Sequence, residues 1–213
     1  MFIKRFFLAT ICLVSFATPA FSAKFKDSHF QTKLSAGLFS GSSSTNDLPP
    51  YKPVFSLSFI TNFRLQELAK EGYNTKSISL PHNTVRVLVS PRAASTNMGM
   101  PAPFMKKSVL SSFPISQMEI KNKNKQVCKP TAKRSSKITQ AVINQYATLL
   151  DYDFDTDYLG LTYLEYDYPS SCFEQDKLYI ALDTKAAKVG RKNITRHAHK
   201  KLSSKTKKAI LQN

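Results

Sequence analysis

The chain has 213 residues, 42% of them hydrophobic, and a net charge of +17. That length is enough for one domain with a hydrophobic core, or for a smaller domain with tails. Beyond the first apolar run, no stretch reaches the roughly 20 apolar residues of a membrane-spanning helix, so we expect the rest of the chain to be soluble or peripheral.

Residues 1–22 have the pattern of a secretory signal peptide. Lys4 and Arg5 precede an apolar run over residues 6–17, and the small residues Ala20 and Ser22 follow it. The run is too short to serve as a stable membrane anchor. We therefore expect cleavage after Ser22 and export of the mature chain to the periplasm or the extracellular space.

Three cysteines occur, and Cys12 lies within the predicted signal peptide. The remaining pair, Cys128 and Cys172, most simply forms one disulfide in an exported protein. The alternative for this pair is a reactive thiol.

Residues 23–50 are predicted to form a flexible leader, because they are rich in Ser, Gly and Pro towards their end. Alternation of large apolar and small residues predicts a strand over 54–60. Helical spacing then predicts a short helix that is capped by Asn62 and stopped by Gly72. Further strands are expected around 78–80 and over 85–89.

Residues 91–112 contain three prolines and three methionines and are expected to form a long loop. A strand over 115–120, a basic turn over 121–125, a helix capped by Ser135 or Ser136 and running to Leu150, and strands over 161–168 and 178–182 complete the pattern. This indicates a single α+β domain over residues 51–183, with a mixed or antiparallel sheet of about five or six strands and two or three helices.

The segment from Val54 to Pro91 resembles one half of a SPOR-type peptidoglycan-binding domain. The resemblance lies in a strand, a short helix ending in Gly72-Tyr73, a strand, and then Val85-Arg86-Val87. It implies a cell-envelope setting. The second strand–helix half is not visible in residues 91–150, so we assign no family on this basis.

Charge is unevenly distributed along the chain. Residues 151–176 carry eight acidic and no basic residues. In an extended chain Asp151, Asp153, Asp155 and Asp157 point the same way, and such a row of carboxylates can bind Ca²⁺. The spacing fits an EF-hand poorly, and a solvent-facing strand edge is the simpler interpretation.

The C-terminal segment 184–213 is predicted to be a basic tail, either a surface helix or disordered. Its cationic side chains are candidates for binding phosphate-rich polymers through counterion release. It contains no aromatic residue, so stacking on bases is not supported. The candidate residues are Arg191, Lys192, Arg196, Lys200, Lys201, Lys205, Lys207 and Lys208.

Motifs for enzymatic chemistry are sparse. The sequence contains no Gly-rich phosphate loop, HExxH, CxxC or GxSxG. Glu165 and Asp167 share one face of a predicted strand and can in principle act as acid and base across a cleft. His197 and His199 do not face each other in a helix, so a metal pair is not expected there.

Three functional hypotheses follow from these patterns. The first is an exported, non-enzymatic protein that binds an anionic polymer or surface: a cell-envelope component, anionic lipid or nucleic acid. The second is a secreted hydrolase or effector that uses the carboxylate-rich segment 151–167, with or without Ca²⁺. The third is self-association of an acidic segment with a basic tail. No specific small-molecule ligand is indicated.

Overall fold

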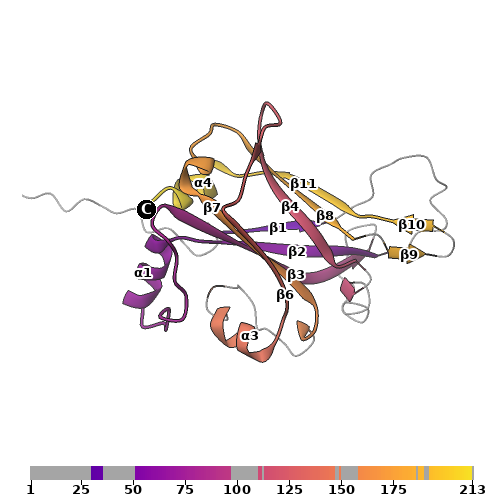
Figure 1. Ribbon diagram of the computed structural model, residues 1–213, viewed down its shortest axis with the longest axis horizontal. Helices are drawn as coiled ribbons and strands as arrows, with labels where there is room; N and C mark the ends of the chain where they lie inside the picture. Colours follow the sequence, from indigo (N-terminus) through magenta and orange to yellow (C-terminus); the bar gives the residue numbers. More distant parts are fainter. Residues whose placement is uncertain are drawn as a thin grey trace, which may run out of the picture.

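In a computed structural model of the protein, two antiparallel sheets pack face to face (Figure 1). The structure describes residues 30–35, 51–96, 110–111, 113–146, 149, 158–185, 187–189 and 192–212. The expected α+β class, with antiparallel strands and one disulfide, is confirmed. The division of the strands between two sheets was not predicted.

The larger sheet has five strands in the order β1-β2-β3-β7-β6. Its strands are β1 (Gln31–Ser35), β2 (Tyr51–Ile60), β3 (Thr84–Thr96), β6 (Ala132–Lys137) and β7 (Thr162–Pro169). The smaller sheet has four strands in the order β11-β8-β4-β5. Its strands are β4 (Ile115–Asn122), β5 (Val127–Cys128), β8 (Leu178–Thr184) and β11 (His197–Lys201).

Alternation along the strands builds the core between the two sheets. Phe55, Leu57 and Phe59 of β2 are buried there, as the sequence pattern predicts, and Ile180 and Leu182 of β8 meet them from the opposite sheet. Cys128 and Cys172, the latter in the 3₁₀ turn η5 (Ser170–Phe173), lie at the same core.

Helices α1 (Asn62–Lys70) and α3 (Gln140–Tyr146) cover the other face of the five-stranded sheet (Figure 1). The side chain of Thr61, rather than Asn62, caps α1 by accepting from the amide of Arg64. Arg64 itself is buried and donates to the carbonyls of Phe59 and Leu149, at 3.2 and 3.1 Å. The central strands β2, β3 and β7 are therefore buried on both faces.

Two further local predictions were wrong. The segment 78–80 forms no strand; Ile78 packs into the second core, and its amide donates to the carbonyl of Thr75 in a turn. Ser135 and Ser136 do not cap a helix, because they pair with β7 as part of β6. Thr139 instead precedes α3, and its hydroxyl accepts from the amide of Val142 at 3.3 Å.

The fold extends beyond the domain boundaries expected at residues 51 and 183. β1 lies inside the expected leader and pairs with β2. At the other end β11 pairs with β8, and helix α4 (Ser204–Ile210) inserts Ile210 into the core beside Leu202. The C-terminal segment is basic, and its buried apolar side chains are too few to give a clear helical or alternating pattern in the sequence. Its structure depends instead on the pairing of β11 with β8.

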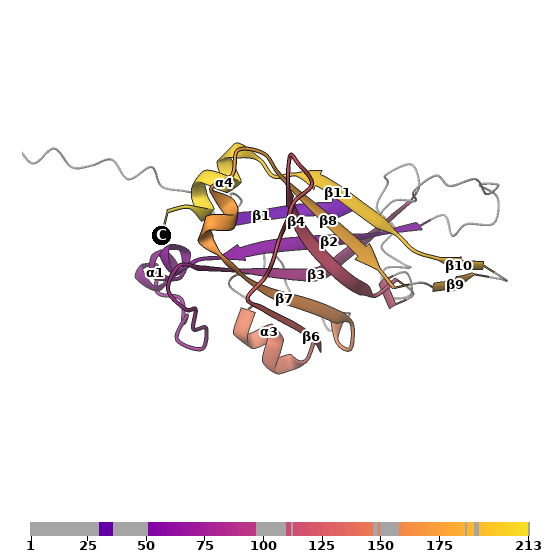
Figure 2. The same cartoon turned by 45° about the horizontal axis from the view of Figure 1, so that its top comes forward.

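Strands β9 (Ala187–Val189) and β10 (Lys192–Ile194) follow β8 and precede β11 in the sequence, and they pair with each other as a two-stranded ribbon. Figures 1 and 2 show this ribbon extending beyond the two sheets. In the expected loop over 91–112, residues up to Thr96 continue β3, and residues 97–109 and 112 lie outside the described part of the chain.

Removal of the disulfide is expected to lower the free energy of unfolding by about 4 kcal/mol, because the bond closes a loop between residues separated by 44 positions in sequence. The Cα atoms of Cys128 and Cys172 lie 5.9 Å apart, within the normal range for a disulfide. Urea unfolding of the oxidised protein and of the Cys128→Ser/Cys172→Ser variant measures the difference. Equal midpoints and slopes for the two proteins would contradict the expectation.

Candidate functional site

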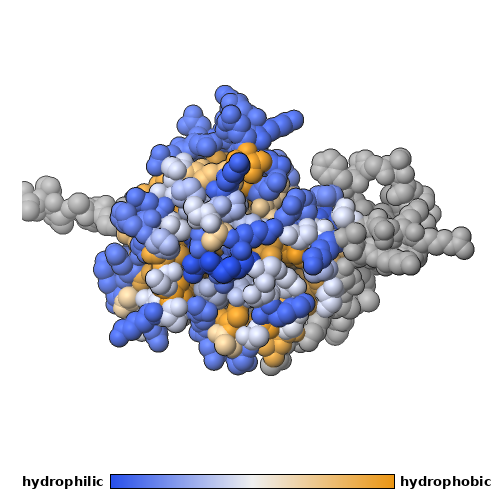
Figure 3. Space-filling model, in the orientation of Figure 1, coloured by the Kyte–Doolittle hydropathy of each residue, from blue (hydrophilic) through white to orange (hydrophobic). Residues whose placement is uncertain are grey.

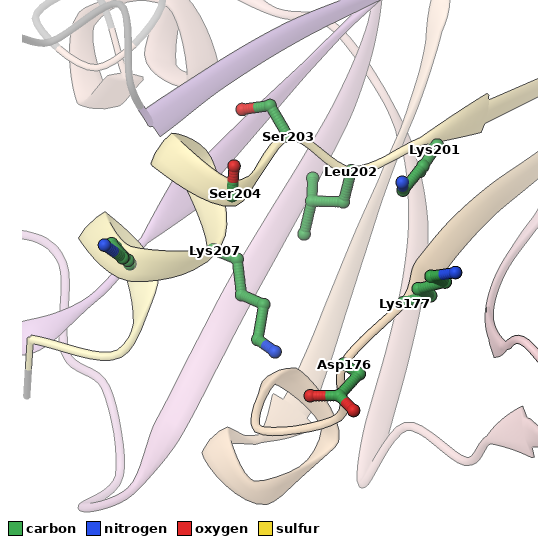
Figure 4. Close-up of a pocket in the computed structure, with 8 residues that line it drawn as sticks. Asp176, Lys177, Lys201, Leu202, Ser203, Ser204 and Lys207 are labelled. Atoms are coloured by element: carbon green, nitrogen blue, oxygen red, sulfur yellow. The ribbon is translucent and has the colours of Figure 1, made fainter.

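A basic depression lies where the end of β11 and helix α4 meet the start of β8 (Figure 4). It has a volume of about 580 Å³. We name it the lysine surface and define it by its four cationic residues, Lys177, Lys201, Lys207 and Lys208. Its remaining lining consists of Asp176, Leu202, Ser203 and Ser204.

Backbone pairing and helix capping position these lysines. The amide of Leu202 donates to the carbonyl of Leu178 at 2.8 Å, which brings Lys201 and Lys177 to neighbouring strand ends. The hydroxyl of Ser203 then accepts from the amide of Thr206 at 3.0 Å and starts α4. The lysine surface therefore belongs to the folded domain and not to a flexible tail.

The apolar face of α4 determines which side chains reach solvent. Ala209 and Ile210 are fully buried, which leaves Lys208 exposed and Lys207 part-buried at the rim of the depression. Lys207 extends towards the loop that carries Asp176 and donates to the carbonyl of Gln175 (Figure 4). The helix is thus attached to the loop after η5 as well as to the core.

The lysine surface has an unbalanced charge. Of the described residues in its lining, Asp176 alone is acidic. Among the residues that the structure describes, none forms an ion pair with any of the four lysines. Four ammonium groups on one ordered surface attract anions, and an anion that binds them releases water and counterions.

The structure separates the eight predicted cationic residues into groups. Lys201, Lys207 and Lys208 belong to the lysine surface, and Lys205 is exposed on the same helix. Lys200 is exposed on β11 and donates to the carbonyl of Lys33 at 2.9 Å, joining the edges of the two sheets. The side chains of Arg191 and Lys192 lie outside the described residues.

Arg196 is a correction to the predicted polyanion site, because its side chain is 0% exposed. Its guanidinium stacks over the ring of Phe113 at 5.0 Å, and burial lowers its pKa. Lys177 is the residue that sequence reasoning missed. It follows the acidic segment and joins the lysine surface only through the pairing of β8 with β11, which no local pattern reveals.

The predicted metal site over Asp151, Asp153, Asp155 and Asp157 lies outside the described residues. Within the described ranges, no group of three or more His, Cys, Asp or Glu side chains is arranged to hold a metal ion.

Glu165 and Asp167 form a buried ionic cluster instead of facing each other across a cleft. They lie on the face of β7 covered by α3, and their side chains are 9% and 7% exposed. Arg86 donates from Nε to Oδ1 of Asp167 at 2.7 Å. Arg134 donates to Oε2 of Glu165 at 2.9 Å and to Oδ2 of Asp167 at 2.8 Å.

Two tyrosines complete this cluster. The hydroxyls of Tyr146 and Tyr163 donate to Oε1 of Glu165 at 3.0 and 3.1 Å. Burial and the charge of Glu165 raise the pKa of Tyr163 to about 12, and the same causes raise the pKa of Tyr146. Each carboxylate thus has its charge and its lone pairs satisfied, which indicates a structural role.

A smaller hollow of about 230 Å³ lies beside α1, between Asn62, Phe63, Gln66, His82 and Asn83. His82 is exposed there, in the turn before β3. Among the described residues, its lining contains no Asp, Glu, Lys or Arg, and it lies on different elements from the lysine surface.

The outer surface is otherwise mainly hydrophilic on the face seen in Figure 3, with hydrophobic residues in small separate areas. None of the helices described is long and apolar enough to cross a membrane. No family model, curated protein or solved structure matches this chain.

Acid is expected to destabilise the protein through Asp167. Burial acts to raise the pKa of this carboxyl, but hydrogen bonds and charge from Arg86 and Arg134 outweigh burial, so its pKa is lowered. A lowered pKa in the folded state stabilises the protein above the unfolded-state pKa, near 4. This stabilisation is lost as the pH falls from there through the folded-state value.

The variant Asp167→Asn should lose on the order of 2 kcal/mol of unfolding free energy at pH 7 and should depend less on pH below 5. Asp176→Asn, at an exposed acid, serves as the control and should leave the curve unchanged. Urea midpoints measured from pH 7 down to pH 3 test this. Parallel curves for the wild type and Asp167→Asn would show that Asp167 does not carry the acid sensitivity.

Proposed function

We propose that the protein is exported and that its lysine surface binds an anionic polymer of the cell envelope. The observation that carries this proposal is that Lys177, Lys201, Lys207 and Lys208 line one depression, where Asp176 is the single acidic residue among those that the structure describes. Because these lysines lie on β11, on the packed helix α4 and directly before β8, little backbone order has to be gained when an anion binds.

The class of ligand follows from the lining. Among the described residues, it contains four ammonium groups, one carboxylate, two serine residues and one leucine, and no aromatic ring. Such a lining binds phosphate or carboxylate groups without stacking on bases, so a repeating anionic polymer fits better than single-stranded nucleic acid. Lysine ammonium groups act as point charges, so the binding tolerates variation in the polymer.

Export rests on two further features. The N-terminal segment has the charged, apolar and small-residue order of a signal peptide. The Cys128–Cys172 disulfide is the kind of bond that persists in oxidising compartments. Together they support a periplasmic or extracellular location, where envelope polymers occur.

Deletion of the C-terminal segment cannot test this proposal, because β11 and α4 contribute to the core. The test uses the triple variant Lys177→Gln/Lys201→Gln/Lys207→Gln in residues 23–213. The matched control is Lys76→Gln/Lys123→Gln/Lys129→Gln, which removes the same charge from exposed lysines on other elements. Binding to purified cell-wall sacculi is measured by co-sedimentation at several salt concentrations.

The first variant should bind at least about tenfold more weakly at low salt, with a shallower dependence of log K on log salt, because fewer counterions are released. The control variant should bind like the wild type. Equal weakening in both variants would show that net charge alone is responsible. If the wild type binds anionic vesicles or DNA more strongly than sacculi, the proposal of a cell-envelope polymer as the ligand is wrong.

A further inference from the structure

Three polar side chains form a continuous hydrogen-bonded chain near the start of β11. Oδ1 of Asp183 lies 2.5 Å from Nδ1 of His197, and Nε2 of the same imidazole lies 3.1 Å from Oγ1 of Thr195. A hydroxyl, an imidazole and a carboxylate are thus linked in the order that activates a nucleophile. None of these residues belongs to the lysine surface.

Strand pairing explains why the three groups meet. His197 is the direct cross-strand partner of Asp183 in the β11–β8 register. Thr195 precedes His197 by two residues, the spacing that places side chains on one face of an extended chain. The adjoining residues Leu182 and Ala198 are buried in the core and hold both strands in position.

A fourth residue orients the carboxylate. Nε2 of Gln117, on β4, donates to Oδ2 of Asp183 at 2.9 Å. This leaves Oδ1 directed at the imidazole. An Asp183 carboxylate that accepts from Nδ1–H favours the neutral tautomer whose Nε2 carries a lone pair, and that lone pair can accept the proton of the Thr195 hydroxyl.

We propose that Thr195, His197 and Asp183 form a hydrolytic site for carboxylic esters. Thr195 acts as the nucleophile and His197 as the general base, and Asp183 is a positioning residue that holds the imidazole in the productive tautomer. This site is independent of the proposed polymer binding and would be an additional activity.

The reaction needs no co-reactant other than water. Oγ1 of Thr195 forms a bond to the acyl carbon as its proton passes to Nε2 of His197, and the bond from that carbon to the alkoxy oxygen breaks. The departing alcohol takes the proton from Nε2. Water then attacks the acyl-threonine ester, giving its proton to Nε2, and the carboxylic acid and the free Thr195 hydroxyl are released.

The exposure of the site limits the class of substrate. The side chains of His197 and Asp183 are 36% and 31% exposed, and Thr195 is exposed. The hydroxyl is therefore accessible to an acyl group presented on a larger molecule or a surface. Selection by a deep binding pocket is not part of the proposal, and small activated esters should also react.

The experiment measures hydrolysis of p-nitrophenyl acetate by residues 23–213. The wild type should exceed the uncatalysed rate, and mass spectrometry after acid quenching should locate an acetyl group on Thr195. Thr195→Val keeps the shape of the side chain and removes the hydroxyl, so it should lower the rate at least about 100-fold and abolish the adduct. Thr195→Ser should retain activity.

His199 supplies a matched control on the same strand. It stacks on Tyr179 with ring centroids 5.2 Å apart and is exposed. His197→Gln should lose the activity and His199→Gln should keep it, with both variants showing wild-type thermal unfolding. A rate unaffected by Thr195→Val, an acetyl group elsewhere, or no hydrolysis above background by the wild type would each overturn the proposal.

The role of Asp183 needs a readout beyond activity. In Asp183→Asn the amide can no longer enforce the Nδ1–H tautomer, so the ¹⁵N shifts of the His197 ring should move towards the Nε2–H form as the rate falls. Loss of rate with an unchanged tautomer would remove Asp183 from the mechanism as a positioning residue.

Discussion

Burial of β7 on both faces is the constraint on which the rest of the structure depends. Leu164, Tyr166 and Tyr168 point into the core between the sheets, while Glu165 and Asp167 point under the helices. A carboxylate in that position is tolerated only when it is paired and hydrogen-bonded. The partners come from both flanking strands, because Arg86 on β3 lies directly opposite Asp167 and Arg134 on β6 lies directly opposite Glu165.

This pairing also defines the order of the strands. The ionic cluster is satisfied only if β3 and β6 lie on opposite sides of β7 in the observed register, since a slip by one residue would move every side chain to the other face. The hydroxyls of Tyr146 on α3 and Tyr163 on β7 then occupy Oε1 of Glu165. The cluster thus links two neighbouring strands and a helix to one central strand, and it supplies specificity of register more than net stability.

The parts of the fold that the sequence predicted are those with local periodic patterns. Alternation at Phe55, Leu57 and Phe59 predicted β2. The Cys128–Cys172 disulfide was predicted because an exported protein with two cysteines usually joins them, and the structure contains this bond. Long-range pairing was invisible to such patterns. β6 has the sequence AKRSSK, without a hydrophobic residue larger than alanine, and is a strand because its backbone pairs with β7. The same holds for β11, whose single buried residue is Ala198.

The basic residues of the C-terminal segment differ in burial, and therefore in what they can do. A count of charge treats Arg196 and Lys201 alike, but one is enclosed against Phe113 and the other lines an open depression. Burial of Arg196 attaches the segment before β11 to the body of the protein, and the pairing of His197 with Asp183 continues that attachment into the strand. Because the segment is fixed at these points and again at Ile210, the lysines between them are held at defined positions. Lysines anchored in this way keep their charges together on one face of the folded domain, whereas the charges of a flexible tail are spread over a larger volume.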